Sequence, residues 1–313
     1  MWRCLKDQSL PNASCPWTPA LEITSKVYMF FFIPLSLTFN ILVFGVNLFH
    51  RSSIRMTDIY FTNIALAGMT LNLVASGRLL GAEWMLGSAP CLALFALFNV
   101  SSLAFIYSAT LLGLDYFIEL TLPQTYLSGQ YRTHHVCEFI WGGATLSSLS
   151  SLLSYACSMM AEDIQECGRL HTQEVGVAIL LFVGFLVPAV TILYSVGLVY
   201  RVGKEADLLS TPQPSLRPLL LVAGPLTFCL WLPHHGSLLL DLLNSTGFLK
   251  LAAKTCLLLQ VKRGSELLAY SSGWAITLLY LALRREFWKR FRDVVAGSRC
   301  HLCSSQTTAE ADI

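Results

Sequence analysis

Charged residues are scarce in this sequence of 313 residues. Lys, Arg, Asp and Glu together make up 13% of it, whereas soluble domains normally carry about a quarter. Hydrophobic residues make up 54%, and the long apolar runs leave no room for a separate soluble domain. The composition therefore excludes an ordinary soluble protein and predicts a single domain in a membrane. The net charge of +2 says little by itself. We expect no nucleic acid among its partners.

Motifs of enzyme chemistry are also missing. The sequence has no H-E-x-x-H, no G-x-S-x-G and no P-loop, which are the patterns of zinc hydrolases, serine hydrolases and nucleotide-binding enzymes. It shows no inverted repeat either, and this argues against a secondary transporter. We expect no enzyme activity, no cofactor and no metal site.

Seven long apolar runs, separated by short polar joints, dominate the sequence. A helix needs about 20 predominantly apolar residues to cross the hydrocarbon core of a bilayer, and it satisfies its own backbone hydrogen bonds there. We therefore predict an all-α membrane protein, a bundle of seven transmembrane helices followed by a short amphipathic helix. The runs lie near residues 27–49, 58–80, 89–114, 136–160, 175–200, 217–243 and 255–283.

The distribution of basic residues predicts which side of the membrane each joint faces. If the N-terminus is outside, more than half of the 21 Lys and Arg residues fall on the inner side, as the positive-inside rule requires. Residues 283–292 alternate apolar and cationic side chains, which predicts an amphipathic helix on the anionic lipids of the inner leaflet. We expect an extracellular segment at 1–24, a seven-helix domain at 25–295 and a cytoplasmic tail at 296–313, in the plasma membrane.

This topology makes four residues candidates for modification. Asn12 and Asn244 begin N-x-S/T sequences on the outer side and are expected to be glycosylated, whereas the acceptor sequence at Asn99 lies within a span. Cys300 and Cys303 follow the basic tail segment, where we expect S-palmitoylation.

Cysteines on the outer side would meet oxidising conditions, which favour disulfides. Cys91 lies at the outer end of the third run, and Cys167 lies in the joint between the fourth and the fifth. We expect these two to form a bridge. A second bridge and one leftover thiol stay open for the remaining outer cysteines, which are Cys4, Cys15 and Cys256.

Landmarks of one receptor family occur in order along the chain. Trp231-Leu232-Pro233 resembles the W-x-P of that family's sixth helix, and Tyr280 followed by Phe287 resembles the end of its seventh. The others are Asn40, Asn63-Ile64-Ala65-Leu66-Ala67, Cys91, Asp115, Pro123, Trp141 and Pro188. Together, at the right spacing, they resemble the rhodopsin-like (class A) G-protein-coupled receptors. Residues 98–158 are similar to one group of vertebrate orphan receptors in that family.

Several positions depart from the family pattern. The family's D-R-Y run begins at Asp115 but has Tyr116 in place of the arginine. The helix-two aspartate is Gly68, and Ile276 stands in place of the asparagine of N-P-x-x-Y. In the family that aspartate holds a sodium ion, and hard cations need charged oxygen ligands, so we expect no sodium site. A glycine there would instead let helices pack closely.

The resemblance also implies a switch and a transducer-facing surface. Trp231 and Pro233 would form the switch, because a proline bends the helix beside a large aromatic ring; packing alone is the alternative. Asp115, Tyr116 and Tyr280 would face the transducer inside the cell.

Polar residues gather at the outer mouth of the predicted bundle. His234 and His235 follow the bend of the sixth helix, and Lys262, Arg263 and Glu266 lie in the outer half of the seventh. Such convergence in an apolar bundle predicts a ligand site, and the two cations would suit a peptide carboxylate or an acidic small molecule. The alternative is a solvated rim whose charges pair internally, as Lys262 and Glu266 can across one helical turn.

Two functions remain open at this point. One is a receptor that binds an unknown extracellular ligand and signals to a heterotrimeric G protein or arrestin. The other is a decoy, scavenger or trafficking receptor without conventional G-protein activation, which the missing arginine favours.

The expected bridge between Cys91 and Cys167 can be tested at the cell surface. Removing a native disulfide typically costs about 2–5 kcal/mol, so Cys91→Ala and Cys167→Ala should each lower surface labelling of an epitope-tagged protein. The double variant should be no worse than either single one. Cys229→Ala, at a cysteine expected only to pack in the sixth helix, is the control. Normal surface levels in both single variants would contradict the bridge.

Overall fold

The structure is a computed structural model that describes residues 19–50, 55–79, 88–121, 130–160, 173–206, 217–248 and 255–296. Within these residues every regular element is a helix. Seven helical segments are long and apolar enough to cross a membrane, which confirms the predicted fold class. These spans are Pro19–Phe49, Met56–Leu79, Leu92–Ile118, His135–Leu153, Val175–Arg201, Pro218–Ser245 and Gln260–Leu283.

The first span begins earlier than its apolar run predicts. Its first helix, α1, starts at Pro19, and proline is favoured at the start of a helix because its missing N–H would have no partner there. Lys26 donates to Glu22 at 2.7 Å, one turn away, and such pairs stabilise a helix. The helix therefore extends beyond the apolar run at its polar end.

Two of the seven spans each contain a short π-helical segment. Pro34 and Pro188 are the second residues of the α-helices that follow these segments. A proline lacks an N–H, and its ring clashes with the carbonyl of the residue four positions before. The wider π turn removes this clash without ending the helix. The first span is α1 (Pro19–Val27), η1 (Tyr28–Phe32) and α2 (Ile33–Phe49), and the fifth is α8 (Gln173–Leu181), η2 (Phe182–Leu186) and α9 (Val187–Ala206).

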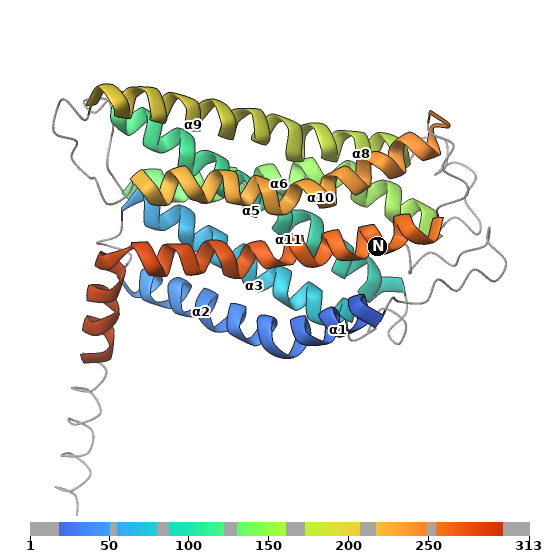
Figure 1. Cartoon of the computed structure of the whole chain (residues 1–313), viewed down its shortest axis with the longest axis horizontal. Helices are drawn as coiled ribbons and strands as arrows, with labels where there is room; N and C mark the ends of the chain where they lie inside the picture. The colour runs from blue at the N-terminus through green and yellow to red at the C-terminus, as the bar shows by residue number, and fades with distance from the viewer. Residues whose placement is uncertain are drawn as a thin grey trace, which may run out of the picture.

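The helices lie side by side in one bundle (Figure 1). The remaining spans are α3 (Met56–Leu79), α5 (Ser88–Thr121), α6 (Gln130–Met160), α10 (Arg217–Ser245) and α11 (Thr255–Leu283). The central helix is α5, which contacts α3, α6, α9 and α10, while α11 packs on α2, α3 and α10. The start of α1 and the end of α11 lie at opposite ends of the bundle (Figure 1), as an odd number of crossings requires.

A last helix, residues 285–296, follows α11 after a break at position 284. We call it the C-terminal helix. In Figure 1 it turns sharply away from α11. The Trp288 indole N–H donates to the Leu281 carbonyl at 2.7 Å, which ties the two helices together across the break. The predicted short helix after the seventh span is thus confirmed.

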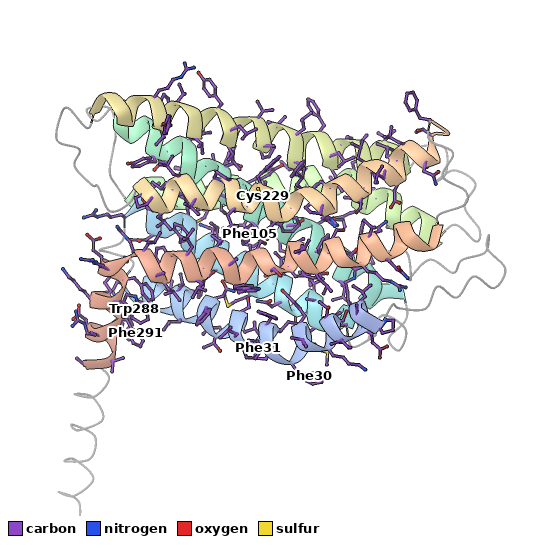
Figure 2. All side chains as sticks on the ribbon, viewed as in Figure 1. Phe30, Phe31, Phe105, Cys229, Trp288 and Phe291 are labelled. Carbon is purple, nitrogen blue, oxygen red and sulfur yellow. The ribbon has the colours of Figure 1, made fainter. Side chains whose placement is uncertain are left out.

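Large apolar side chains cover the outside of the bundle as well as its interior. Phe30 and Phe31 are 72% and 61% exposed, whereas Phe105 is fully buried; Figure 2 shows the first two pointing away from the bundle. Exposed apolar surface of this kind marks contact with lipid or a partner. On helices long enough to span a bilayer, it fits a membrane protein.

Gly68 lies where α2, α3 and α11 come closest together. A Cβ atom at Gly68 would lie 3.1 Å from the side-chain nitrogen and oxygen of Asn40. A Cβ atom at Gly273 of α11 would lie 3.4 Å from the Cα of Gly68. Small residues permit such an approach of helices in a membrane, so the structure agrees with the packing interpretation of Gly68.

This close approach predicts opposite effects of the same change at two glycines. Gly68→Ala should lower the thermal unfolding temperature in detergent, because forcing extra atoms into a packed core costs about 1–3 kcal/mol. Gly45→Ala on α2 is the matched control, because no atom lies within 4 Å of its added Cβ. Alanine is favoured over glycine within a helix by about 0.5–1 kcal/mol, so this variant should be neutral or more stable. Equal unfolding temperatures for the two variants would contradict the packing role.

Candidate functional site

Charged side chains form a first polar group at the end of the bundle where α1 begins. We call Arg78, Asp241, Lys262 and Glu266 the ion-pair cluster. Arg78 Nη1 lies 3.1 Å from Glu266 Oε2 and donates to the Tyr270 hydroxyl at 3.3 Å. Lys262 donates to Asp241 Oδ2. The side chain of Lys262 is 6% exposed and that of Glu266 is 12% exposed, so these charges depend on one another rather than on water.

The ion-pair cluster combines two predicted site residues with Arg78, a charge at the outer end of the second span, and with Asp241, which was not identified from the sequence. Lys262 and Glu266 were predicted from their place in the outer half of the seventh helix, whereas Asp241 was not singled out. Asp241 follows His234 by seven residues on α10, which is two helical turns and therefore the same face. That spacing, together with a charge inside an apolar run, was the signal available. Arg263 lies half-buried beside Lys262.

Trp231 is fully buried in the middle of an aromatic group. The ring centroids of Phe98 and Phe105 on α5 each lie 6.3 Å from that of Trp231. The rings of His234 and His235 lie 6.0 Å and 5.8 Å from it. His235 Nδ1 donates to the Trp231 carbonyl at 3.0 Å. Both predicted histidines thus face the interior and contact the predicted switch residue.

Phe98 joins the aromatic group to the ion-pair cluster. Its ring packs edge-on against His234 at 5.3 Å and against Tyr270 at 5.8 Å. The Arg78 guanidinium carbon lies 5.9 Å from the centroid of the same ring, within the range of a cation–π contact. A change at Arg78 would therefore act on Phe98, which contacts Trp231.

Pro233 lies inside α10, two residues after Trp231. A proline cannot donate to the carbonyl four residues earlier, here that of Cys229, and a helix bends at such a point. Figure 1 shows α10 changing direction along its length. The bend and the buried indole are thus adjacent, and the switch role of Trp231 and Pro233 stays a prediction.

A second polar group, the central network, lies around Gly68 and carries no charge. It comprises Ser36 and Asn40 of α2, Asn72 of α3 and Thr277 of α11. Thr277 Oγ1 donates to Asn40 Oδ1 at 2.7 Å. The amides of Asn40 and Asn72 donate to Ser36 Oγ at 3.1 and 2.8 Å. Amides and hydroxyls occupy this region and offer no anionic oxygen among the described residues.

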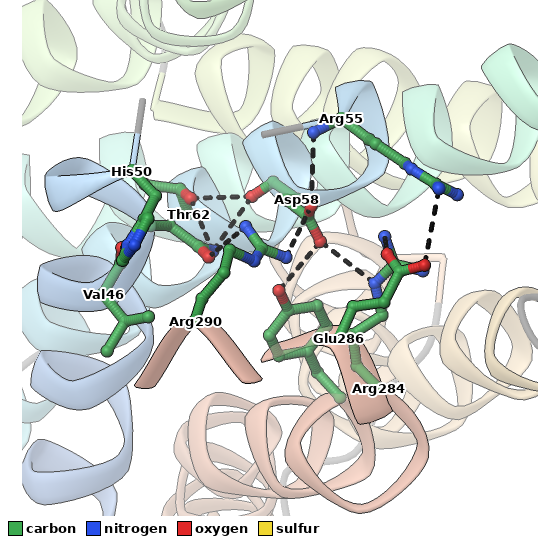
Figure 3. Close-up of polar contacts among 10 residues, drawn as sticks. Val46, His50, Arg55, Asp58, Thr62, Arg284, Glu286 and Arg290 are labelled. Carbon is green, nitrogen blue, oxygen red and sulfur yellow. Dashed lines mark hydrogen bonds and ion pairs between the residues drawn. The ribbon is translucent and has the colours of Figure 1, made fainter. Parts of the chain in front are cut away.

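A third polar group lies where α11 meets the C-terminal helix (Figure 3). We call Asp58, Tyr280, Arg284 and Arg290 the junction cluster. Asp58 Oδ1 accepts from the Tyr280 hydroxyl at 2.9 Å and from Arg284 Nε at 3.2 Å. Asp58 Oδ2 accepts from Arg290 Nη2 at 2.8 Å and from the Arg55 backbone N–H at 3.2 Å. Both carboxylate oxygens are therefore fully engaged.

The position of Asp58 in α3 explains part of this geometry. Asp58 is in the first turn of the helix, where a carboxylate accepts from the backbone N–H just before the helix and favours the positive end of the helix dipole. The side chain is 1% exposed. Removing one partner of a buried ion pair typically costs about 3–5 kcal/mol, because the other charge is left uncompensated, so Asp58 depends on the arginines that reach it from beyond α11.

Tyr280 was identified from the sequence, but its ionic partners were not. Arg284 and Arg290 were assigned to the anionic leaflet as part of the amphipathic segment. The structure instead directs both toward Asp58, while Arg285, Lys289 and Arg292 of the same segment are exposed. Asp58 lies 226 residues before Arg284, so no spacing rule connects the two.

The other predicted residues lie as follows. Asp115 is half-buried and Tyr116 is buried on α5. Asn244 is exposed in the last turn of α10, and Cys91 lies near the start of α5. Four predicted residues lie outside the described ones, namely Asn12, Cys167, Cys300 and Cys303. Glycosylation, the disulfide and lipidation therefore stay predictions.

Comparison with known proteins agrees with this geometry. Residues 39–272 match the family described as 7 transmembrane receptor (rhodopsin family). The chain is 37% identical to G-protein coupled receptor 146 of Mus musculus, over 96% of this chain and 94% of that protein. It is 36% identical to the protein of the same name from Xenopus laevis, over 90% and 87%. It is 26% identical to the B2 bradykinin receptor of Cavia porcellus, over 92% and 81%.

The seven-helix bundle and these matches define a receptor of the G-protein-coupled class. The chain belongs to the rhodopsin family of seven-transmembrane receptors. Within it, the chain is related to G-protein coupled receptor 146, which confirms the resemblance seen in residues 98–158. Since members of this family are receptors and not enzymes, the prediction that the chain is not an enzyme is confirmed as well.

The neutral central network predicts how the protein responds to sodium. Thermal unfolding in sodium chloride and in N-methyl-D-glucamine chloride at equal ionic strength should give the same temperature, because the amides and hydroxyls around Gly68 carry no charge to hold a hard cation. A rhodopsin-family receptor that has the helix-two aspartate, measured in parallel, is the control. A sodium-specific rise of several degrees in this protein would contradict the prediction.

Proposed function

We propose that this protein is a plasma-membrane receptor that binds an extracellular ligand at the ion-pair cluster and signals to a heterotrimeric G protein or arrestin. The observation that carries the proposal is the run of contacts from Arg78 through Phe98 to Trp231. A ligand that takes Arg78 away from Glu266 would change the packing of Phe98 on the buried indole. Since Trp231 lies beside the proline bend of α10, a local change of charge pairing would bias the shape of a whole helix.

The charges of the cluster favour an acidic ligand, such as a peptide carboxylate or an acidic small molecule. Arg78 and Lys262 each bind a carboxylate of the protein itself, and a ligand carboxylate would compete for the same cations. The Nδ1 of His234 and the Nε1 of Trp231 are buried and make no hydrogen bond within the described part of the chain. A buried polar nitrogen left unpaired costs about 1–3 kcal/mol, so a ligand with acceptor oxygens would gain by reaching them.

The proposed orientation places the ion-pair cluster outside and the junction cluster inside. Seven spans put the start of α1 and the C-terminal helix on opposite sides. The C-terminal helix exposes Arg285, Lys289 and Arg292, which suits the anionic inner leaflet and the positive-inside rule. The ligand site would then face the extracellular space, and Asp115 and Tyr116 would face the cytoplasm.

A second candidate function is a decoy or trafficking receptor that binds its ligand without nucleotide exchange. The observation that favours it is Tyr116, which lies buried on α5 where the family has its arginine. The two functions separate in one experiment: second-messenger output is compared between cells that do and do not express the protein, over a range of surface levels. Output that rises with surface level supports the receptor. Output equal to that of the empty cells at every level contradicts signalling and favours the decoy.

The role of Tyr116 can be tested by restoring the family's residue. Tyr116→Arg would place a cation next to Asp115, and a partly exposed ion pair is worth about 0–1 kcal/mol. A difference of 1 kcal/mol changes a two-state population about fivefold, so basal output should change by up to that factor at equal surface level. Asp115→Asn in the natural background is the control and should do little. If Tyr116→Arg leaves both basal output and transducer recruitment unchanged, this inner face does not control signalling.

A further inference from the structure

We infer that the junction cluster is a latch: Asp58, Arg284 and Arg290 hold Tyr280 and the C-terminal helix in the resting arrangement. It takes over the restraint that the arginine missing at position 116 would otherwise supply. The inference rests on the proposed function for its signalling consequence only, because the mechanical contact stands by itself.

The latch joins three separate elements through one carboxylate. Asp58 belongs to α3, Tyr280 to α11 and Arg290 to the C-terminal helix, while Arg284 occupies the break between the last two. Figure 3 shows Arg284 and Arg290 converging on Asp58. Moving any one element away from the others requires breaking a charged contact to this carboxylate.

Asn47 of α2 closes the cluster from its remaining side. Its Oδ1 accepts from Arg290 Nη1 at 3.2 Å, and its Nδ2 donates to Thr62 Oγ1 at 3.1 Å. Arg290 therefore bridges a carboxylate and an amide on two different helices. These two contacts fix the orientation of its guanidinium. A lysine has a single amino group and could not make both contacts with the same geometry.

Burial makes the latch a two-position element rather than a soft contact. Asp58 and Arg284 are 1% and 3% exposed, so water does not replace a partner gradually as the helices move apart. A charge taken out of water must stay paired or move to where water can reach it. The inner end of the bundle therefore has two stable conformations, latched and open, and few intermediate conformations.

Tyr280 moves with the latch because aromatic rings hold it on both sides. Its ring stacks on Phe61 of α3 with centroids 4.4 Å apart and packs edge-on against Phe287 of the C-terminal helix at 5.6 Å. The hydroxyl is bound to Asp58. When the C-terminal helix leaves, Tyr280 loses one of its two rings, and Asp58, which holds its hydroxyl, loses Arg290.

An exposed ion pair at the same junction supplies a matched control. Arg55 Nη2 lies 3.4 Å from Glu286 Oε1, and both side chains are 46% exposed. Exposed pairs of this kind contribute little to stability. Arg55→Gln therefore removes one arginine from the same place, while it keeps the backbone N–H that donates to Asp58 and leaves Glu286 its other partner, Arg284.

The test compares Arg290→Gln, Arg290→Lys and Arg55→Gln with the natural full-length protein. Arg290→Gln is expected to fold, since Asp58 keeps Arg284, Tyr280 and a backbone donor. Hydrogen–deuterium exchange of residues 285–296 should rise at least about tenfold through local opening, and hydroxyl-radical oxidation of Tyr280 should rise with it. Arg290→Lys keeps the charge, so its exchange and oxidation rates should lie between those of Arg290→Gln and the natural protein. Arg55→Gln should match the natural protein in both. Basal second-messenger output at equal surface level should change in Arg290→Gln and not in Arg55→Gln.

Each other outcome contradicts a different part of the proposed latch. If exchange and oxidation are the same in Arg290→Gln and Arg55→Gln, the latch is contradicted. Faster exchange of the C-terminal helix with Tyr280 still protected would contradict the coupling between them. If both the helix and Tyr280 are released and the output of a signalling protein does not change, the restraint on signalling is contradicted. If no variant and not even the natural protein gives output, the proposed function fails, while exchange and oxidation still decide the latch.

Discussion

A polar group inside a bilayer must find its partners within the protein, and this constraint arranges the whole interior of the bundle. Water is not available there to satisfy a stray amide, hydroxyl or charge. Many of the polar side chains consequently gather at three depths, where several helices contribute to each cluster. The ion-pair cluster and the junction cluster are charged and lie toward the two ends, while the central network is neutral. Apolar and aromatic side chains fill the space between them and cover the outside.

The same constraint accounts for the departures from the family pattern. At Gly68 the chain has lost a mid-bilayer carboxylate, and neutral partners such as Asn40 and Thr277 complete the hydrogen bonds without it. At Tyr116 it has lost a cation. Charge is instead concentrated at Asp58, whose partners come from elements far along the chain. Inserting the middle of the bundle into a membrane therefore costs less free energy, and the ionic contacts lie where the helices end.

Sequence analysis predicted the spans well because length and hydropathy are local properties. Trp231 and Tyr280 were singled out for a related reason, since a family landmark is recognised by spacing within one helix. The junction cluster was not predictable in this way. Its partners are separated by more than 220 residues, and the sequence of residues 283–292 fits a lipid-facing helix equally well. Only the direction in which the C-terminal helix leaves α11 decides that Arg290 turns toward α3.

One helix face joins the three clusters, and this has a mechanical consequence. Glu266, Tyr270, Thr277 and Tyr280 follow one another on α11 at intervals of one or two turns, so they share a side of the helix. Glu266 belongs to the ion-pair cluster, Thr277 to the central network and Tyr280 to the junction cluster. A rotation or shift of α11 must therefore change the partners of all three at once. The two ends of the bundle can then be coupled without a chain of side-chain movements, because a rigid helix with two discrete arrangements transmits the change by itself.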